Sequence, residues 1–171
     1  MGKTMPTEIA LPERSGARLR LVAESDAELM RRWKNENRRF FFHKQEITPE
    51  QQLAWFRTYL TRPDDHNYAV EERLGSGYET VGLLACRLLQ DTVDIYNVMR
   101  GKRTAPAVVS MGDTLKLFCS EIARFYSVPI TCNVLKNNPA IGWYLRNGFV
   151  QRGDAPDHVV LRYNGNEVGT T

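Results

Sequence analysis

Tyr144 lies in the stretch of this sequence that most suggests chemistry, "LKNNPAIGWYLRNGF" (135–149), between an Asn-Pro pair and a Gly-Phe pair. A phenol with a pKa of about 10 stays protonated at neutral pH and can act as a proton donor. On one helix alone, the favoured interpretation of Tyr144 is an amphipathic core position beside Ile141.

Three residues are candidates for accepting a proton. Asp94 lies in a segment rich in β-branched and aromatic residues, and His43 and Glu46 lie in the polar stretch after "RRFFF". A lone acid in a strand is usually surface charge, so all three candidates stay open. No cluster of His, Cys and carboxylate residues has the spacing of metal ligands, and no metal is expected.

The stretch "RGKRTAPAVVSMGDTLKLF" (100–118) contains three basic residues, Arg100, Lys102 and Arg103. They could bind an anion, although a basic run in a loop is more often simply solvated. A P-loop is excluded, because Gly101-Lys102 would require glycine at position 96 and Ser or Thr at 103, where Tyr96 and Arg103 stand.

Composition limits the class of protein. The chain has 171 residues, 42% hydrophobic and 25% charged, which suits one globular domain with a sizeable core. A net charge of +3 is too small to indicate nucleic acid but suits a modest anionic ligand. No apolar run is long enough for a membrane span or a secretory signal, so a cytoplasmic location is expected. The odd number of cysteines, without a C-x-x-C pair, favours buried free thiols.

The expected organisation is a flexible leader at residues 1–16, a domain at 17–164 and a flexible tail at 165–171. "RLRLVAE" (18–24) alternates as a strand does, and Ser25 with Glu28 forms a capping box for the helix that follows. A second helix is expected from Thr48 as its cap and Pro49 as its first residue. Its apolar stripe is Leu53, Phe56 and Leu60.

Strands are expected at 67–72, 80–89 and 92–99. From Pro106 the apolar period becomes that of a long helix, with Met111, Leu115, Phe118, Ile122 and Phe125 on one face. A strand at 128–135, a short helix at 138–147 closed by Gly148, and strands at 148–153 and 158–164 complete the order β-α-α-β-β-β-α-β-α-β-β.

This order predicts an α/β (α+β) fold with a mixed, mainly antiparallel sheet of six to seven strands and four helices. The crossover through the long helix is the one connection expected to join parallel strands. The free N–H groups and the dipole at the N-terminus of that helix could hold an anion such as a phosphate.

The segment "CNVLKNNPAIGWYLRNGF" resembles the C-terminal signature of the GNAT superfamily of acyl-CoA N-acyltransferases. The features that match in spacing are Asn137, Ala140, Tyr144, Gly148 and Phe149. The resemblance covers roughly residues 18–163. The front half is similar to the branch with ribosomal-protein N-terminal and nucleotide-amino-sugar acetyltransferases. The resemblance to this superfamily implies a sheet splayed at its centre and acetyl-CoA as co-substrate.

One motif departs from this family. Its pyrophosphate loop, Arg/Gln-x-x-Gly-x-Gly/Ala, is degenerate here, because Ala107 replaces the basic residue if Gly112 takes the last glycine position. A pyrophosphate needs N–H donors rather than glycines as such, and a helix started by Pro106 would still offer amides at 108–110.

The resemblance implies roles for particular residues. Tyr144 would be the general acid for the departing thiolate, a backbone N–H near Val98 or Met99 would bind the oxyanion, and Asp94, Glu46 or His43 would be the base. The residues implied in cofactor binding are Val98, Met99, Arg103, Val108, Val109, Ser110, Met111, Gly112, Asn137 and Tyr144. Those implied in substrate binding are Phe41, His43, Trp55 and Asn97.

The implied activity is transfer of an acetyl group to the primary amine of a small molecule, with an amino sugar or nucleotide-linked amino sugar fitting best. Protein N-terminal acetylation and an antibiotic amine stay open, as does a non-catalytic binding or regulatory module on the same fold. The expected partner is a small-molecule amine, with no nucleic acid and no membrane; a homodimer is left open.

Overall fold

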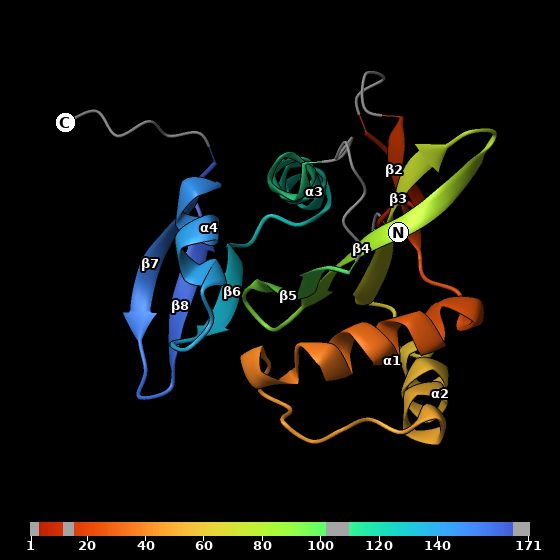
Figure 1. Cartoon of the computed structure of the whole chain (residues 1–171). Helices are drawn as coiled ribbons and strands as arrows, with labels where there is room; N and C mark the ends of the chain where they lie inside the picture. The colour runs from red at the N-terminus through yellow and green to blue at the C-terminus, as the bar shows by residue number, and fades with distance from the viewer. Residues whose placement is uncertain (1–3, 12–15, 102–109, 166–171) are drawn as a thin grey trace.

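The described strands form a single mixed sheet of eight strands, in the order β1-β2-β3-β4-β5-β6-β8-β7, and the helices pack around it (Figure 1). The computed structural model describes residues 4–11, 16–101 and 110–165. Every neighbouring pair is antiparallel except β5 with β6. The strands are β1 Glu8–Ala10, β2 Ala17–Leu21, β3 Asp65–Leu74, β4 Gly77–Leu88, β5 Val93–Arg100, β6 Ile130–Leu135, β7 Phe149–Asp154 and β8 His158–Tyr163.

Helices cover both faces of this sheet. They are α1 Ala27–Glu36, α2 Pro49–Tyr59, α3 Met111–Phe125 and α4 Ala140–Arg146, with short 3-10 turns at Glu24–Asp26 and Arg38–Phe40. Figure 1 shows α3 on one face of the central strands and α1 with α2 on the other. Among the described residues, no helix is both long and apolar enough to cross a bilayer.

Two hydrophobic clusters fill the spaces between helices and sheet. On the α3 side, Leu115, Phe118 and Ile122 pack against alternate residues of the central strands. On the other side, Met30 and Trp33 of α1 and Phe56 of α2 pack against residues such as Leu83. Because β4 is buried on both faces, its sequence is a continuous apolar run rather than an alternating one.

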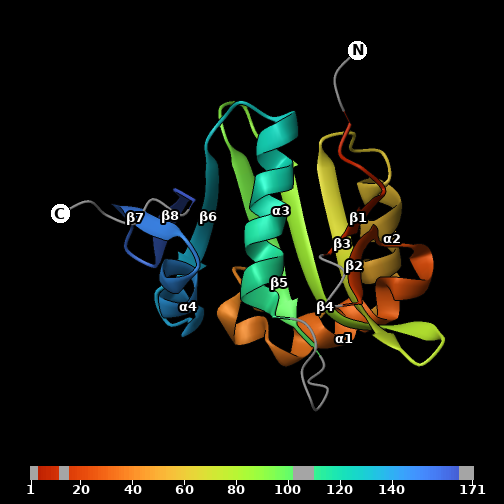
Figure 2. The same ribbon diagram turned by 90° about the horizontal axis from the view of Figure 1, so that it is seen from above.

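The parallel pair β5–β6 is very short. It consists of Val93 opposite Ile130 and Asp94 opposite Thr131, and β5 continues to Arg100 without β6 beside it. Figure 2 shows the sheet opening at this point, with α3 lying across it. The splayed centre implied by the family resemblance is therefore present.

The pairing of β4 with β5 also contains an irregularity. Leu83 lies opposite Met99, but Ala85 lies opposite Tyr96, so β5 has one extra residue between these points. Asn97, inside the bulge, has a φ of 50°, a left-handed conformation that asparagine tolerates better than most residues. The bulge turns the following residues of β5 at the point where the sheet opens.

The order of elements expected from the sequence is confirmed, with one strand added. The stretch before Ala17, expected to be a flexible leader, contains β1, which pairs with β2 and buries Ile9, while Met5 and Leu11 are also buried. Three residues are too few to display a hydrophobic period, so the strand left no pattern in the sequence. Residues 166–171 of the expected tail lie outside the described residues.

Two local expectations at the front helices are corrected. Ser25 and Glu28 do not form the capping box of α1. Instead, the Asp26 carboxylate accepts a hydrogen bond from the Ala23 N–H at 2.7 Å and forms an ion pair with Arg20 at 2.7 Å. Leu60 does not continue the apolar stripe of α2, because it is 66% exposed. The buried positions are Gln52, Phe56 and Tyr59.

The expected cap of α2 is confirmed, whereas the expected start of the long helix lies outside the described residues. Thr48 caps α2 as expected: its hydroxyl accepts from the Gln51 N–H, and the Gln51 side chain accepts from the Thr48 N–H. The long helix was expected to start at Pro106, which lies outside the described residues. As described, α3 begins at Met111 with Ser110 as its cap.

Candidate active site

A cleft of about 620 Å³ opens where β5 and β6 diverge. One wall is β5 and the other is formed by β6 and α4. The segment 40–43, between α1 and α2, also borders it. The residues considered below that line it are Lys34, Phe41, His43, Trp55, Arg87, Asp94, Tyr96, Asn97, Val98, Met99, Cys132, Asn138 and Tyr144.

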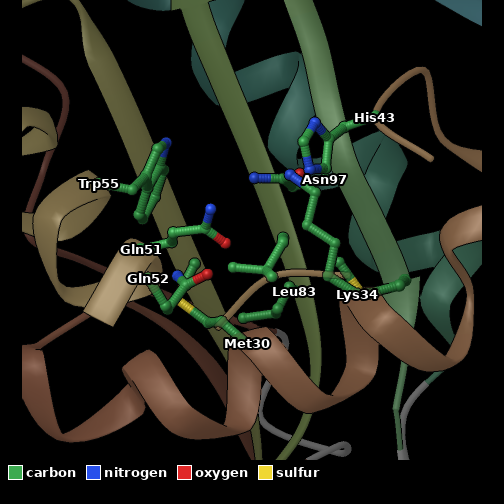
Figure 3. Close-up of a pocket in the computed structure, with 10 residues that line it drawn as sticks. Met30, Lys34, His43, Gln51, Gln52, Trp55, Leu83 and Asn97 are labelled. Carbon is green, nitrogen blue, oxygen red and sulfur yellow. The ribbon is translucent and has the colours of Figure 1, made fainter. Parts of the chain in front are cut away.

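A second pocket, of about 310 Å³, adjoins this cleft. It lies between α1, α2 and the middle of strands β4 and β5. Its lining is Met30, Lys34, His43, Ile47, Gln51, Gln52, Trp55, Leu83, Asn97 and Met99, shown in Figure 3. Five of these residues also line the cleft, namely Lys34, His43, Trp55, Asn97 and Met99. The two spaces therefore meet at the bulge of β5, and we call the smaller one the side pocket.

Tyr144 borders the cleft from α4. Its side chain is buried, and its ring packs edge-on against Trp143 and Phe149. Burial raises the pKa of the Tyr144 phenol, and the neighbouring Cys132 thiol adds to this effect. Burial also raises the pKa of Cys132, to about 12. Both groups are therefore protonated at neutral pH, so the Tyr144 hydroxyl is present as a donor and not as a base, although its raised pKa makes it a weaker acid than a free phenol.

Asp94 lies at the closed end of the cleft, in the last pair that β5 makes with β6. Its carboxylate is engaged by Arg87, whose Nε and Nη2 lie 3.0 and 2.9 Å from Oδ2. Burial raises the pKa of Asp94, while the Arg87 guanidinium opposes that rise. The carboxylate is thus on the cleft wall but already paired.

The other two base candidates are placed differently from each other. Glu46 is exposed and is not among the residues that line the cleft or the side pocket. His43 lines both spaces. Figure 3 shows its imidazole beside Asn97, across the side pocket from Trp55.

The expected substrate-binding aromatic residues both reach the site. Trp55 lines both spaces, and its indole stacks on Tyr59 with ring centres 5.3 Å apart. Phe41 lines the cleft and packs against the cluster that α1 and α2 cover. Trp55 is held by Tyr59 on one side, which fixes its orientation toward the pocket.

Eight of the ten expected cofactor-binding residues fall into three groups, and Asn137 and Tyr144 are described separately. Val98 and Met99 line the cleft, after the bulge. Ser110 caps α3 by accepting from the Asp113 N–H at 3.2 Å, and Met111 and Gly112 begin the helix. Arg103, Val108 and Val109 lie outside the described residues.

Gly112 and Asn137 have structural partners of their own. A Cβ on Gly112 would lie 2.4 Å from Asn147 Oδ1, so the glycine permits close contact between α3 and the end of α4. Asn137 is exposed, and its Nδ2 donates to the Arg39 carbonyl at 3.1 Å. It is the next residue, Asn138, that lines the cleft.

A buried hydrogen-bonded network supports the bulge from behind. The Asn97 Nδ2 donates to Asn67 Oδ1 at 3.2 Å, and the Asn67 Nδ2 donates to the Tyr96 hydroxyl at 2.8 Å. The Tyr96 hydroxyl in turn donates to the Asp65 carboxylate. The Asn67 N–H donates to the Tyr59 hydroxyl at 3.1 Å. The left-handed residue Asn97 is thereby tied to β3 and α2.

Comparison with known proteins rests on structure alone. No family model matches the sequence, and no curated protein does. Solved structures do match. A probable acetyltransferase of the GNAT family from Chromobacterium violaceum aligns with a TM-score of 0.70 at 13% identity, over 95% of this chain and 87% of that one. FdhC, a nucleotide-linked sugar GNAT, aligns with a TM-score of 0.68 at 16% identity, over 87% of this chain and 86% of that one.

A third match is spermidine N-acetyltransferase from Vibrio cholerae, solved with CoA and spermine. It aligns with a TM-score of 0.68 at 16% identity, over 86% of this chain and 94% of that one. The chain has the GNAT fold. The fold that the family resemblance implied is confirmed by these structures, whose low identities carry no residue roles.

Within this GNAT fold, four residues of the site were missed by sequence reasoning. They are Lys34, Arg87, Tyr96 and Gln52. Lys34 follows Met30 by four residues and so lies on the buried face of α1, a position where a lysine is unusual. This unusual position of a lysine could have been recognised from the sequence. The pairing of Arg87 with Asp94 depends on strand register, and Gln52 replaces an apolar residue on the buried face of α2.

The hydrogen-bonded network behind the bulge should contribute to the stability of the fold. Replacing Tyr96 with Phe removes the donor to the buried Asp65 carboxylate, so the free energy of unfolding should fall by about 1–3 kcal/mol. Urea unfolding at neutral pH measures the change. Tyr78→Phe is the control, because Tyr78 is exposed. Equal stability of the two variants would show that the Tyr96 hydroxyl does not support the bulge.

Proposed function

We propose that this chain is an acetyl-CoA-dependent N-acetyltransferase that acts on the primary amine of a small molecule. The observation that carries the proposal is the divergence of β5 and β6 after two paired residues, with Tyr144 on the wall of the resulting cleft. The GNAT fold of the neighbouring structures supports it. The side pocket gives the amine a place beside the cleft.

The cleft fits the thioester arm of acetyl-CoA. Beyond Asp94, no described strand pairs with the edge of β5 that faces β6, so its backbone groups can bind the amides of a pantetheine chain as an added strand would. The N-terminus of α3, at Ser110–Gly112, offers N–H groups and a positive dipole end to a diphosphate. Acetyl-CoA supplies the activated acetyl group. The chain positions the thioester and the amine and transfers the protons.

The chain's own groups can perform the three tasks of direct acetyl transfer. A backbone N–H of Val98 or Met99, turned by the bulge, stabilises the oxyanion of the tetrahedral intermediate. Tyr144 donates its proton to the departing thiolate. Among the three base candidates, Asp94 is paired with Arg87. His43 and Glu46 are both exposed, but of these two only His43 borders the cleft and the side pocket. We therefore favour His43 for removing the proton of the amine.

The size of the side pocket favours a small acceptor over a protein N-terminus. Its volume is about 310 Å³, and it lies between α1, α2 and the sheet. Trp55 presents an aromatic face, and Gln51 and Gln52 present amide groups, which suits the hydroxyl groups and apolar face of a sugar ring. An amino sugar or a nucleotide-linked amino sugar is the acceptor that this lining fits best.

Calorimetric titration with acetyl-CoA tests the proposal. We expect binding with a Kd below about 1 mM, in the range usual for enzyme substrates. A free-thiol assay with amino sugars, peptides and aminoglycosides should then show release of CoA with an amino sugar. Absence of binding at millimolar acetyl-CoA would contradict the proposal, and binding without thiol release for any amine would favour a non-catalytic module.

Tyr144→Phe tests the proton donor. Removing the hydroxyl should lower kcat by about ten- to a hundredfold while the affinity for acetyl-CoA is retained, because the proton is needed only as the thiolate departs. Steady-state kinetics and calorimetry measure the two quantities. Tyr163→Phe is the matched control, since Tyr163 packs on Phe149 and is not in the lining of the cleft. Unchanged kcat in Tyr144→Phe would remove its role as the acid.

A further inference from the structure

Lys34 reaches the junction of the cleft and the side pocket from the buried face of α1. Figure 3 shows its side chain rising from α1 toward Asn97 and His43, on the opposite side of the pocket from Trp55. It lines both spaces. Among the described residues, no ion pair to the Lys34 ammonium is formed; its Nζ lies 5.7 Å from the centre of the Phe41 ring. This is a half-buried cation directed toward the place where an acceptor would bind.

The surroundings of Lys34 contain no free negative charge. The described lining of the side pocket has neither aspartate nor glutamate. The carboxylate of the cleft wall, Asp94, is paired with Arg87. Arg87 and Asp94 together form a neutral pair, although the Arg87 guanidinium still repels the Lys34 ammonium. The positive charge of Lys34 is therefore not balanced by a free carboxylate of the described lining.

An uncompensated ammonium in this place is costly. Burial lowers the pKa of Lys34, and the positive charge of Arg87 lowers it further. Both effects express the same physical fact, that the charged form lacks the water and the counterion it would have at the surface. An anionic group bound beside Nζ would supply the counterion, whereas a second cation would add repulsion.

We infer that the acceptor carries an anionic oxygen group, a phosphate or a carboxylate, which pairs with Lys34 while the amine reaches the bulge of β5. This inference rests on the proposed function, since it concerns the acceptor of the same reaction. It narrows the substrate class to amines bearing a negative charge. Polyamines and other polycations, which include the spermine bound by the Vibrio cholerae neighbour, are disfavoured by the charge of this pocket.

Lys34→Met tests the inference, because Met keeps the length of the stem and removes the charge. The acceptors are glucosamine, a phosphate monoester of glucosamine, an amino-uronic acid, a UDP-linked amino sugar and spermidine. For the wild-type protein we expect kcat/KM to be higher for at least one anionic sugar than for glucosamine. In Lys34→Met that preference should fall by about ten- to a hundredfold, as expected for a lost charge-assisted contact. The three anionic sugars distinguish phosphate, carboxylate and diphosphate as the source of the charge.

Calorimetric binding of the same sugars to the CoA-saturated protein gives a readout that does not require turnover. Lys116→Met is the matched control, since Lys116 is a partly exposed lysine of α3. An equal loss for glucosamine and for the anionic sugars, or a wild-type preference for spermidine, would overturn the inference. Failure to bind acetyl-CoA would contradict the proposed function. In that case, a preference of the CoA-free protein for an anionic sugar that depends on Lys34 would still support anion recognition, and its absence would reject it.

Discussion

The separation of β5 from β6 after two residue pairs is the constraint on which the rest of the structure depends. A strand edge left without a partner exposes backbone N–H and C=O groups, and proteins usually cover such edges. In the part of the chain that the structure describes, the facing edges of β5 and β6 have no strand partner beyond their two pairs, and they form the walls of a cleft. The sheet accepts this gap because each half is held by other contacts: β6 pairs with β8 along Thr131–Leu135, and β5 pairs with β4.

Three further features keep the gap in one shape. On one face, α3 lies across it and contacts the end of α4 through Gly112 and Asn147. On the other, the segment between α1 and α2 reaches the far half of the sheet, where Phe42 packs edge-on against His158 with ring centres 5.4 Å apart. Behind β5, the network from Asn97 through Asn67 to Asp65 holds the bulge. These contacts restrain the backbone that borders the gap, and restraint of this kind reduces the entropic cost of binding a ligand.

Sequence reasoning predicted those parts of the fold that depend on local patterns. The Thr48 cap with its reciprocal Gln51 bond, the four-three stepping of α3 and the Asn-Pro start of α4 are all written within a few neighbouring residues. What it missed depends on distant partners. The Asp26 carboxylate, rather than a Ser25–Glu28 capping box, binds the backbone at the start of the first helix: it accepts from the Ala23 N–H and is held by Arg20 on β2. Asp94 is an obvious candidate base in the sequence, and its engagement by Arg87 becomes visible only through the register of β4 and β5. Lys34 and Gln52 are the two missed site residues whose positions on the buried faces of helices could have been noticed in the sequence.

We propose that a thioester binds between β5 and β6 with its diphosphate at the start of α3. Amide NMR spectra recorded during a titration with acetyl-CoA test where the ligand lies. The account predicts that the backbone amides of Val98 and Met99, beside the gap, and of Gly112, at the start of α3, shift most. Shifts confined to the outer strands β1 and β7, with those three amides unchanged, would contradict it.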